Sequence, residues 1–268
     1  MIFEFKNGTE LVEKYSDYLD TNKYLSAFFR IDAPLVTEIT DKNFVYSAEN
    51  GAKRLLAMRF DPFAVLLFGD AELTGEMLDF LFLRGCLVDH FMCDDVIGSA
   101  VTDYMRDRRG IELIKALGMD FMECREKGEP TDPSVETPTE ADTDELAECM
   151  ARFVADCGLI DVVNKEHIKA SVGRYRVVRA NGKIVSCAAM TRDTDESMKL
   201  VSVYTRDEYR GKGYARKAVN AVRNEIIDMG YIATLNVDQK NQISYHLYSS
   251  LGFKKLFSHG EYRVVSLS

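Results

Sequence analysis

A segment with two glycines carries the residues best suited to hold an anion. An apolar, strand-like run ends at Thr205, and Gly211 and Gly213 then lead directly into a helix that begins near Tyr214. The start of a helix leaves backbone N–H groups without internal partners and carries a partial positive charge. Glycines at that point let an anion approach the main chain without an intervening side chain. The segment therefore predicts a phosphate-binding turn.

Basic side chains surround this turn in a chain whose net charge is -9: Arg210, Lys212, Arg216 and Lys217. Two common phosphate-binding patterns fail. The Walker pattern needs a glycine where Arg206 stands and a Ser or Thr after Lys212. The dinucleotide pattern needs a third glycine where Arg216 stands. A tight turn with solvated charges is the alternative interpretation.

A second segment, 241–253, predicts a short helix with a polar face. Asn241, Ser244 and Tyr248 are spaced i, i+3 and i+7, which places them along one side. A phenol has an unperturbed pKa near 10, so Tyr248 would be neutral at pH 7 and able to donate a proton. Taken alone, Asn241 fits a helix N-cap and Tyr248 an ordinary half-buried tyrosine. The residues expected to face the core instead are Ile243, Leu247 and Leu251.

Together the two segments resemble the GNAT superfamily of acyl-CoA-dependent N-acetyltransferases. Arg210, Gly213 and Ala215 match its Arg/Gln-x-x-Gly-x-Gly/Ala turn, which binds a diphosphate. Residues 241–253 look like its Asn-x-x-Ser/Ala-x-x-Leu-Tyr-x-x-x-Gly-Phe segment. The resemblance covers about residues 144–268. It implies acetyl-CoA as the co-substrate and no metal.

The resemblance also implies a role for particular residues. The pantetheine arm would bind along a strand that splays from its neighbour, one N–H of which would stabilise the oxyanion. Tyr248 would be the general acid that protonates the departing thiolate. The residues that would bind the cofactor are Val203, Tyr204, Thr205, Arg210, Gly211, Lys212, Gly213, Tyr214, Ala215, Asn241 and Ser244.

The sequence departs from the superfamily at two places. Some members carry a glutamate as general base eleven residues before the Arg/Gln of the turn, and here that position is Lys199. Glu196 and Asp238 lie nearby in sequence, but nothing assigns either of them, and a base acting through water is equally open. Arg206 and Asp207 replace two prolines of a bacterial subgroup with a similar two-part layout. We expect that change to alter the stiffness of the loop rather than the cofactor contacts.

The elements that would position these residues follow an α+β order. Periodicity and turn signals predict, in sequence, helices over 143–157 and 165–172, strands over 175–179, 184–190 and 198–205, a helix over 214–229, a strand over 232–237, a helix over 243–251, and strands over 253–257 and 262–265. Asn181-Gly182 is a hairpin signal. We expect a GNAT-like, mostly antiparallel sheet flanked by helices.

The first half repeats this order without a glycine-rich turn, with strands over 44–48, 54–60, 63–68, 86–92 and 120–124 and helices over 72–82 and 96–106. It is either a degenerate GNAT-like copy or an unrelated α/β module. Between the halves lies an acidic segment with three of the chain's five prolines, predicted to be extended and unpacked. We therefore predict domains at 1–126 and 144–268, with a linker at 127–143.

Composition narrows the function classes. The acidic balance argues against nucleic-acid binding and slightly favours a cationic acceptor. The longest apolar run, 63–68, is far shorter than the roughly 20 residues of a membrane helix. Six unpaired cysteines are typical of reduced thiols in a cytoplasmic protein, and His90 with Cys93 fits core residues better than metal ligands.

The predicted function is transfer of an acetyl group to a primary amine of a small molecule or peptide, by direct attack in a ternary complex. The alternative is a non-catalytic acyl-CoA-binding regulatory protein. In a third interpretation the N-terminal half is a protein-interaction module that brings the catalytic half to a partner. The acceptor and the oligomeric state cannot be read from the sequence.

Overall fold

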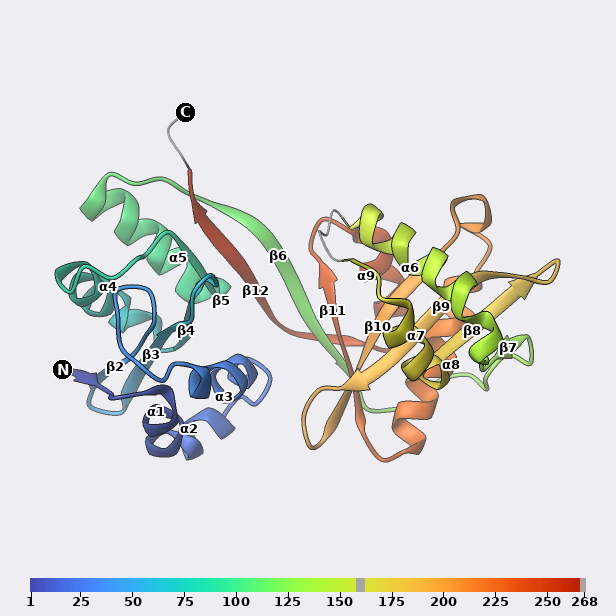
Figure 1. Ribbon diagram of the computed structural model, residues 1–268, viewed down its shortest axis with the longest axis horizontal. Coiled ribbons are helices and arrows are strands. Elements are labelled where there is room, and N and C mark those ends of the chain that lie inside the picture. The colour runs from blue at the N-terminus through green and yellow to red at the C-terminus, as the bar shows by residue number, and fades with distance from the viewer. Residues whose placement is uncertain (158–161, 266–268) are drawn as a thin grey trace. The chain divides into compact units, whose positions relative to one another are not determined.

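The structure is a computed structural model that describes residues 1–157 and 162–265 (Figure 1). The chain forms two compact units. Unit 1 comprises Met1–Asp120, Asp238–Lys240 and Phe257–Ser268, and unit 2 comprises Phe121–Val237 and Asn241–Leu256. Among the described residues three strands contribute to both units: β6 (Leu113–Cys124), β12 (Lys254–Val264) and β11 (Ile232–Asp238), of which only Asp238 belongs to unit 1.

Unit 2 is a mixed sheet with helices on both faces. Its elements are β7 (Val135–Glu136), α6 (Thr143–Asp156), α7 (Lys165–Ser171), β8 (Tyr175–Ala180), β9 (Lys183–Arg192), β10 (Ser197–Thr205), α8 (Tyr214–Asp228), β11 (Ile232–Asp238) and α9 (Gln242–Ser250). Strands β7 to β10 pair antiparallel, and β10 pairs parallel with β11. The predicted α+β class is confirmed. Asn181 and Gly182 have positive φ values of 52° and 77°, as a two-residue hairpin turn requires.

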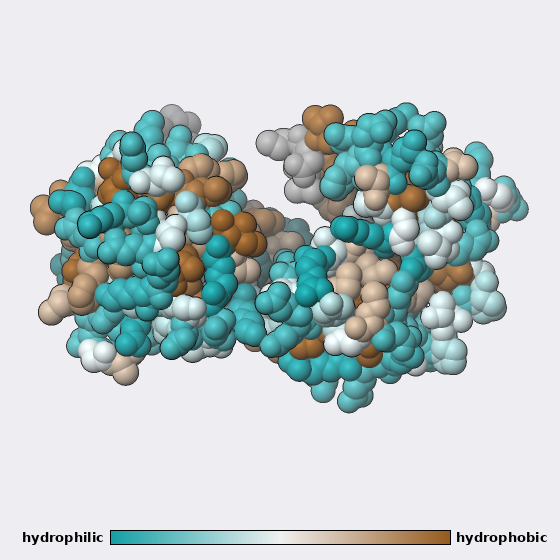
Figure 2. Space-filling view, turned by 60° about the horizontal axis from the view of Figure 1, so that its bottom comes forward, coloured by the Kyte–Doolittle hydropathy of each residue, from teal (hydrophilic) through white to brown (hydrophobic). Residues whose placement is uncertain are grey.

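Two apolar clusters sandwich this sheet. One joins α8 and α9 to the strands through side chains such as Val219, Leu235 and Leu251. The other joins α6 and α7 to the strands through Leu146, Ile168 and similar residues. On the face seen in Figure 2, hydrophilic side chains cover most of the surface and apolar ones lie in scattered small groups.

Two details of the predicted C-terminal elements are wrong. The strands expected over 253–257 and 262–265 are one strand, β12, because its polar middle is paired with a neighbouring strand. Ile243 is 86% exposed although its spacing from Leu251 suggested a shared core face. Only the last turns of the nine-residue helix α9 reach the core, and Ile243 lies in its first turn.

The acidic segment after residue 126 packs on α8 instead of standing free. The Gly128 N–H donates to Asn224 Oδ1 at 3.1 Å, and the Glu129 carbonyl accepts from the side-chain amides of Asn220 and Asn224 at 3.0 and 2.8 Å. These amides satisfy backbone groups that the prolines and charges suggested would remain in water. A division into domains at 127–143 stays a prediction.

Unit 1 has a related order of elements. They are β1 (Ile2–Glu4), α1 (Gly8–Lys14), α2 (Ser16–Asp20), α3 (Ala27–Asp32), β2 (Phe44–Asn50), β3 (Lys53–Arg59), β4 (Val65–Gly69), α4 (Thr74–Leu83), β5 (His90–Asp94) and α5 (Asp95–Tyr104). Strands β1 to β4 pair antiparallel and β4 pairs parallel with β5, as β7 to β11 do in unit 2. This pairing agrees with a degenerate copy, which remains a hypothesis.

Candidate active site

Strand β10 contains a bulge in front of the glycine turn. Val201 lies opposite Ala189 of β9, but Tyr204 lies opposite Cys187, so β10 holds one extra residue over this interval. Ser202 within the bulge has a φ of +55°, a conformation uncommon for a residue with a side chain. A bulge of this kind bends the strand and increases its local twist.

The bulge coincides with a loss of pairing on the other side of β10. In the described residues, parallel pairing with β11 runs from Ser197↔Ile232 to Lys199↔Thr234 and ends there. Beyond Lys199 the two strands are no longer paired, and we call the unpaired side of β10 the gap. The splayed strand that the resemblance implied is therefore present.

Backbone direction decides which residues face this gap. The Arg206 N–H donates to the Val185 carbonyl of β9 at 2.9 Å, and the Tyr204 carbonyl accepts from Ser186 Oγ at 3.1 Å. Because backbone groups alternate along a strand, those of Val203 and Thr205 point away from β9, toward the gap. Of the three predicted strand positions, only Tyr204 turns its backbone to β9.

The turn after β10 exposes a set of backbone amides. Gly211 and Gly213 have φ values of 73° and 81°, and a Cβ added at either would meet nothing within 4 Å. Gly213 is the N-cap of α8 and has no side chain that could occupy the helix start. The first intrahelical bond runs from the Lys217 N–H to the Gly213 carbonyl at 3.3 Å, so the amides of Tyr214, Ala215 and Arg216 precede it.

The predicted basic residues of the turn are partly engaged by the protein itself. The Arg210 guanidinium contacts Asp156 at 2.5 Å and Asp207 at 2.8 Å. Burial lowers the pKa of Arg210, but these carboxylates outweigh it and raise the pKa overall. The Lys212 ammonium donates to the Glu208 carbonyl at 2.9 Å. Arg210 therefore braces the turn, while the amides remain open.

Arg206 is a buried residue whose role the sequence analysis missed. It is 7% exposed and donates to the Ile184 carbonyl at 2.8 Å and to Glu148 of α6 at 3.0 and 3.3 Å. Its guanidinium lowers the pKa of Glu148. The pair fastens the end of β10 to α6, which is more than a change of loop stiffness. The sequence contained one signal for this ion pair. Glu145 and Glu148 stand one turn apart on the predicted helix and form an acidic pair.

Helix α9 presents the second predicted segment. Asn241 is its N-cap and accepts from the Ser244 N–H at 3.0 Å. Tyr248 is 6% exposed and lies edge-to-face against Phe253, with ring centroids 6.1 Å apart. Burial raises the pKa of the Tyr248 phenol, so it stays protonated at neutral pH.

The core clusters show which predicted residues come together. Val203, Tyr214 and Tyr248 all pack into the cluster formed with α8 and α9. The Tyr204 side chain belongs to the cluster on the α6 and α7 side. The Arg216 guanidinium donates to Ser250 Oγ at 2.8 Å and so joins the first turn of α8 to the end of α9.

Comparisons with known proteins agree with this geometry. The family model "Acetyltransferase (GNAT) family" matches residues 140–253. An uncharacterized N-acetyltransferase of Mycobacterium bovis is 31% identical over 108 residues, which cover 40% of this chain and 69% of the relative. The chain belongs to the GNAT family of acetyltransferases.

Two other proteins extend the comparison. The L-amino acid N-acyltransferase of Escherichia coli is 38% identical over 53 residues, 19% of this chain and 31% of that protein. A GNAT-family acetyltransferase from Colwellia psychrerythraea has a TM-score of 0.63 at 10% identity and covers 98% of each chain. At that identity the likeness shows the fold of the whole chain.

The position of the GNAT glutamate base is held by a paired lysine. The Lys199 ammonium lies 2.7 Å from Asp193, whose carboxylate also accepts from Thr234 Oγ1 at 2.8 Å. This pair lies where β10 and β11 are still joined, at the closed end of the gap. Glu196 is exposed in the turn between β9 and β10.

Two kinds of feature are missing from the described ranges, 1–157 and 162–265. No helix in them is both long and apolar enough to cross a membrane. No group of three or more His, Cys, Asp or Glu side chains in them is arranged to hold a metal ion.

Proposed function

We propose that this GNAT chain transfers an acetyl group from acetyl-CoA to a primary amine of a small molecule or peptide, by direct attack in a ternary complex. One observation carries the proposal. The strand that loses its pairing at Lys199 and bulges at Ser202 is the same strand that ends in the open turn at Gly211 and Gly213. The gap that would hold the thioester arm and the turn that would hold the diphosphate therefore follow one another along the chain.

In the proposed complex the diphosphate lies on the amides from Gly211 to Arg216, at the positive end of α8. Asn241 and Ser244 contact the cofactor further along. The pantetheine arm follows the backbone of Val203 and Thr205 in the gap. One N–H of this strand holds the thioester oxygen as it becomes negative, a contribution of about 3 kcal/mol to transition-state stabilisation.

Tyr248 is the proposed general acid. The amine attacks the thioester carbonyl, a C–N bond forms and the C–S bond breaks. The departing thiolate takes the phenolic proton, and Tyr248 regains a proton from solvent. Because burial raises its pKa, the phenol carries this proton across the neutral range.

The attacking amine must lose a proton. Lys199 cannot accept that proton, because its side chain is already an ammonium. Asp193, 2.7 Å from Lys199, and a water chain are the two candidate acceptors. The absence of a glutamate at Lys199 is also the observation that favours the second candidate function, a non-catalytic acyl-CoA-binding protein.

Calorimetry with coenzyme A, followed by an acetyl-CoA consumption assay, tests the proposal. The amine panel should include L-amino acids, since a relative is an L-amino acid N-acyltransferase. We expect binding and amine-dependent release of free thiol. Binding without turnover on any amine would favour the non-catalytic function, and no heat at millimolar coenzyme A would overturn both.

A further inference from the structure

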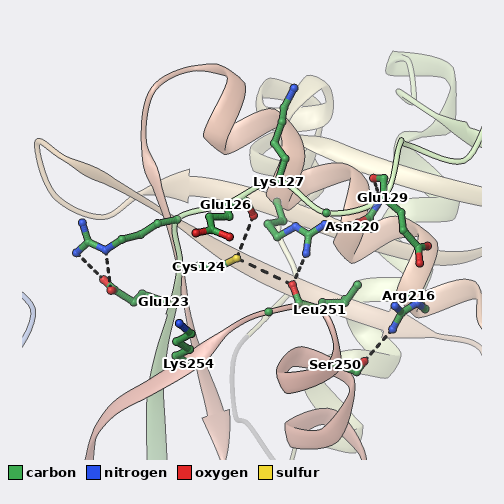
Figure 3. A pocket seen from close by; sticks show the side chains of 14 residues that line it. Glu123, Cys124, Glu126, Lys127, Glu129, Arg216, Asn220, Ser250, Leu251 and Lys254 are labelled. Carbon is green, nitrogen blue, oxygen red and sulfur yellow. Dashed lines mark hydrogen bonds and ion pairs between the residues drawn. The ribbon is translucent and has the colours of Figure 1, made fainter.

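A pocket of about 430 Å³ lies in unit 2 beside the first turns of α8 (Figure 3). It is bounded by α8, by the end of α9 and by residues 123–129. Arg216, Asn220 and Arg223 line it from α8 at positions i, i+4 and i+7, so they share one face of the helix. The pocket therefore starts at the helix turn that carries the open amides and extends about 10 Å along the helix.

Arg223 is a buried cation held by neutral groups. It is 3% exposed and donates to the Leu251 carbonyl and to the side-chain oxygens of Asn220 and Asn224. In the described part of the chain no carboxylate forms an ion pair with it. Buried arginines are normally paired with an anion, because an uncompensated charge is costly to remove from water.

Two further cations of the pocket have no carboxylate partner in the described residues. Arg216 donates to the neutral Ser250 hydroxyl at 2.8 Å, as Figure 3 shows, and Lys254 is exposed at the start of β12. By contrast, Arg125 is paired with Glu123 at 2.8 Å, and Lys127 is paired with Asp228.

Acidic side chains only partly offset this charge. Besides the paired Glu123, the pocket is lined by Glu126 and Glu129. The three cations without a carboxylate partner, Arg216, Arg223 and Lys254, thus exceed these two carboxylates by one. In a chain of net charge -9, this is a local excess of positive charge next to an anion-binding turn.

We propose that this pocket receives the 3′-phosphate of the coenzyme A whose diphosphate lies on the turn. The inference rests on the proposed function. In coenzyme A the two groups are separated by a single ribose, and the 3′-phosphate carries a charge of about -1.5 to -2 at pH 7. Arg216 stands in the first turn of α8, next to the open amides, and the buried Arg223 and the exposed Lys254 line the rest of the pocket. The chain should therefore distinguish coenzyme A from dephospho-coenzyme A, which lacks only this phosphate.

The test is calorimetry with both nucleotides on the whole 268-residue chain. We expect native protein to bind coenzyme A about tenfold more tightly than dephospho-coenzyme A, the effect of one charge-assisted contact. Lys254→Ala should reduce this ratio severalfold without changing dephospho-coenzyme A binding, and Arg216→Ala should also reduce it. Lys183→Ala removes an exposed lysine of the same unit outside the pocket and should leave the ratio unchanged.

The outcomes separate the two proposals. Equal binding of both nucleotides to native protein would overturn the pocket assignment and leave the acetyltransferase proposal standing. If neither nucleotide binds, both the pocket assignment and the acetyltransferase proposal are wrong.

Millimolar inorganic phosphate should weaken coenzyme A binding more than dephospho-coenzyme A binding. If phosphate binds but leaves both nucleotides unaffected, the pocket is an independent anion site and the assignment is wrong. Because Lys254 is exposed, its variant keeps the test valid should Arg216→Ala unfold.

Discussion

The two units contain corresponding strand-to-helix turns that differ in their chemistry. In unit 2 the turn between β10 and α8 has two open glycines and a helix start without a side-chain cap. In unit 1 the turn between β4 and α4 carries Asp70 and Glu72, and Glu76 lies in the first helical turn. Asp70 is bonded to the β3 backbone, accepting from the Arg54 N–H at 2.8 Å. In unit 1, carboxylates and internal hydrogen bonds thus lie at the start of the helix, where the turn of unit 2 leaves its backbone amides open.

The glycines in the two turns also serve different purposes. A Cβ on Gly69 would lie 2.1 Å from the Arg54 carbonyl, so this glycine is required for close packing of two strands. A Cβ on Gly213 would meet nothing within 4 Å. Register differs as well, since β3 and β4 pair from Leu55↔Gly69 to Met58↔Leu66 without a bulge. Similar topology thus supports anion binding only where the loop provides it.

The largest effect should follow from placing a negative charge in the turn of unit 2, like the carboxylates in the β4–α4 turn of unit 1. Gly213→Asp places a carboxylate at the start of α8 in a strained left-handed conformation, and we expect at least a 100-fold loss of coenzyme A affinity by calorimetry. Gly85→Asp is the matched control in unit 1, with a φ of 69° and open space around it. Equal losses in both variants would attribute the effect to folding.

The next effect concerns one buried tyrosine in each unit. Tyr248→Phe should lower kcat about 100-fold while coenzyme A binding is retained, because it removes only the proton donor. Tyr46 of unit 1 is 2% exposed, and burial raises its pKa too. Tyr46→Phe should leave steady-state turnover unchanged. Unchanged kcat in Tyr248→Phe would remove Tyr248 from the mechanism.

A smaller effect is expected from the pair that anchors β10. Arg206→Met should lower the free energy of unfolding by about 2 kcal/mol, measured in urea, because it removes charged hydrogen bonds to a half-exposed carboxylate. The lowered pKa of Glu148 means that the pair contributes fully above the carboxylate's ordinary pKa. The difference between native and variant should therefore shrink as the pH falls below about 4.5. A difference independent of pH would contradict the ion pair.

The smallest effect at physiological pH concerns buried tyrosines, which are present in each of the two units. Burial raises the pKa of Tyr18 to about 12, and also raises those of Tyr248 and Tyr262. Since the unfolded phenols ionise near 10, these groups should not alter stability below pH 10 but should reduce it above. A rise of phenolate absorbance near pH 10 that accounts for all 13 tyrosines of the folded chain would contradict this burial.

Local signals allowed the sequence to predict the conformation of the turn, whereas the opening of the strand was expected only through the family resemblance. Gly211, Gly213 and the Asn181-Gly182 turn depend on backbone conformations that only a few residue types adopt, so their positions were readable. The extra residue at Ser202 and the end of pairing at Lys199 depend on register with two other strands. No residue type marks either one.

Long-range partners also explain the other misses. Arg206 was expected only to alter the stiffness of the loop, because its partner Glu148 comes from α6, which lies far away in the sequence. Asn220 and Asn224 look like ordinary helix residues, yet they hold the acidic segment against α8. Residues 258–261 were left between two expected strands, and the pairing of His259 to Arg263 with β5 joins those strands into one.

That pairing has a consequence for biosynthesis. The strand that pairs with β5 (His90–Asp94) is made of residues 259–263, which are synthesised long after β5 itself. Chains usually acquire structure from the N-terminus as they emerge. Unit 1 therefore lacks one strand until residues 259–263 have left the ribosome, so a shorter nascent chain would expose the unpaired edge of β5.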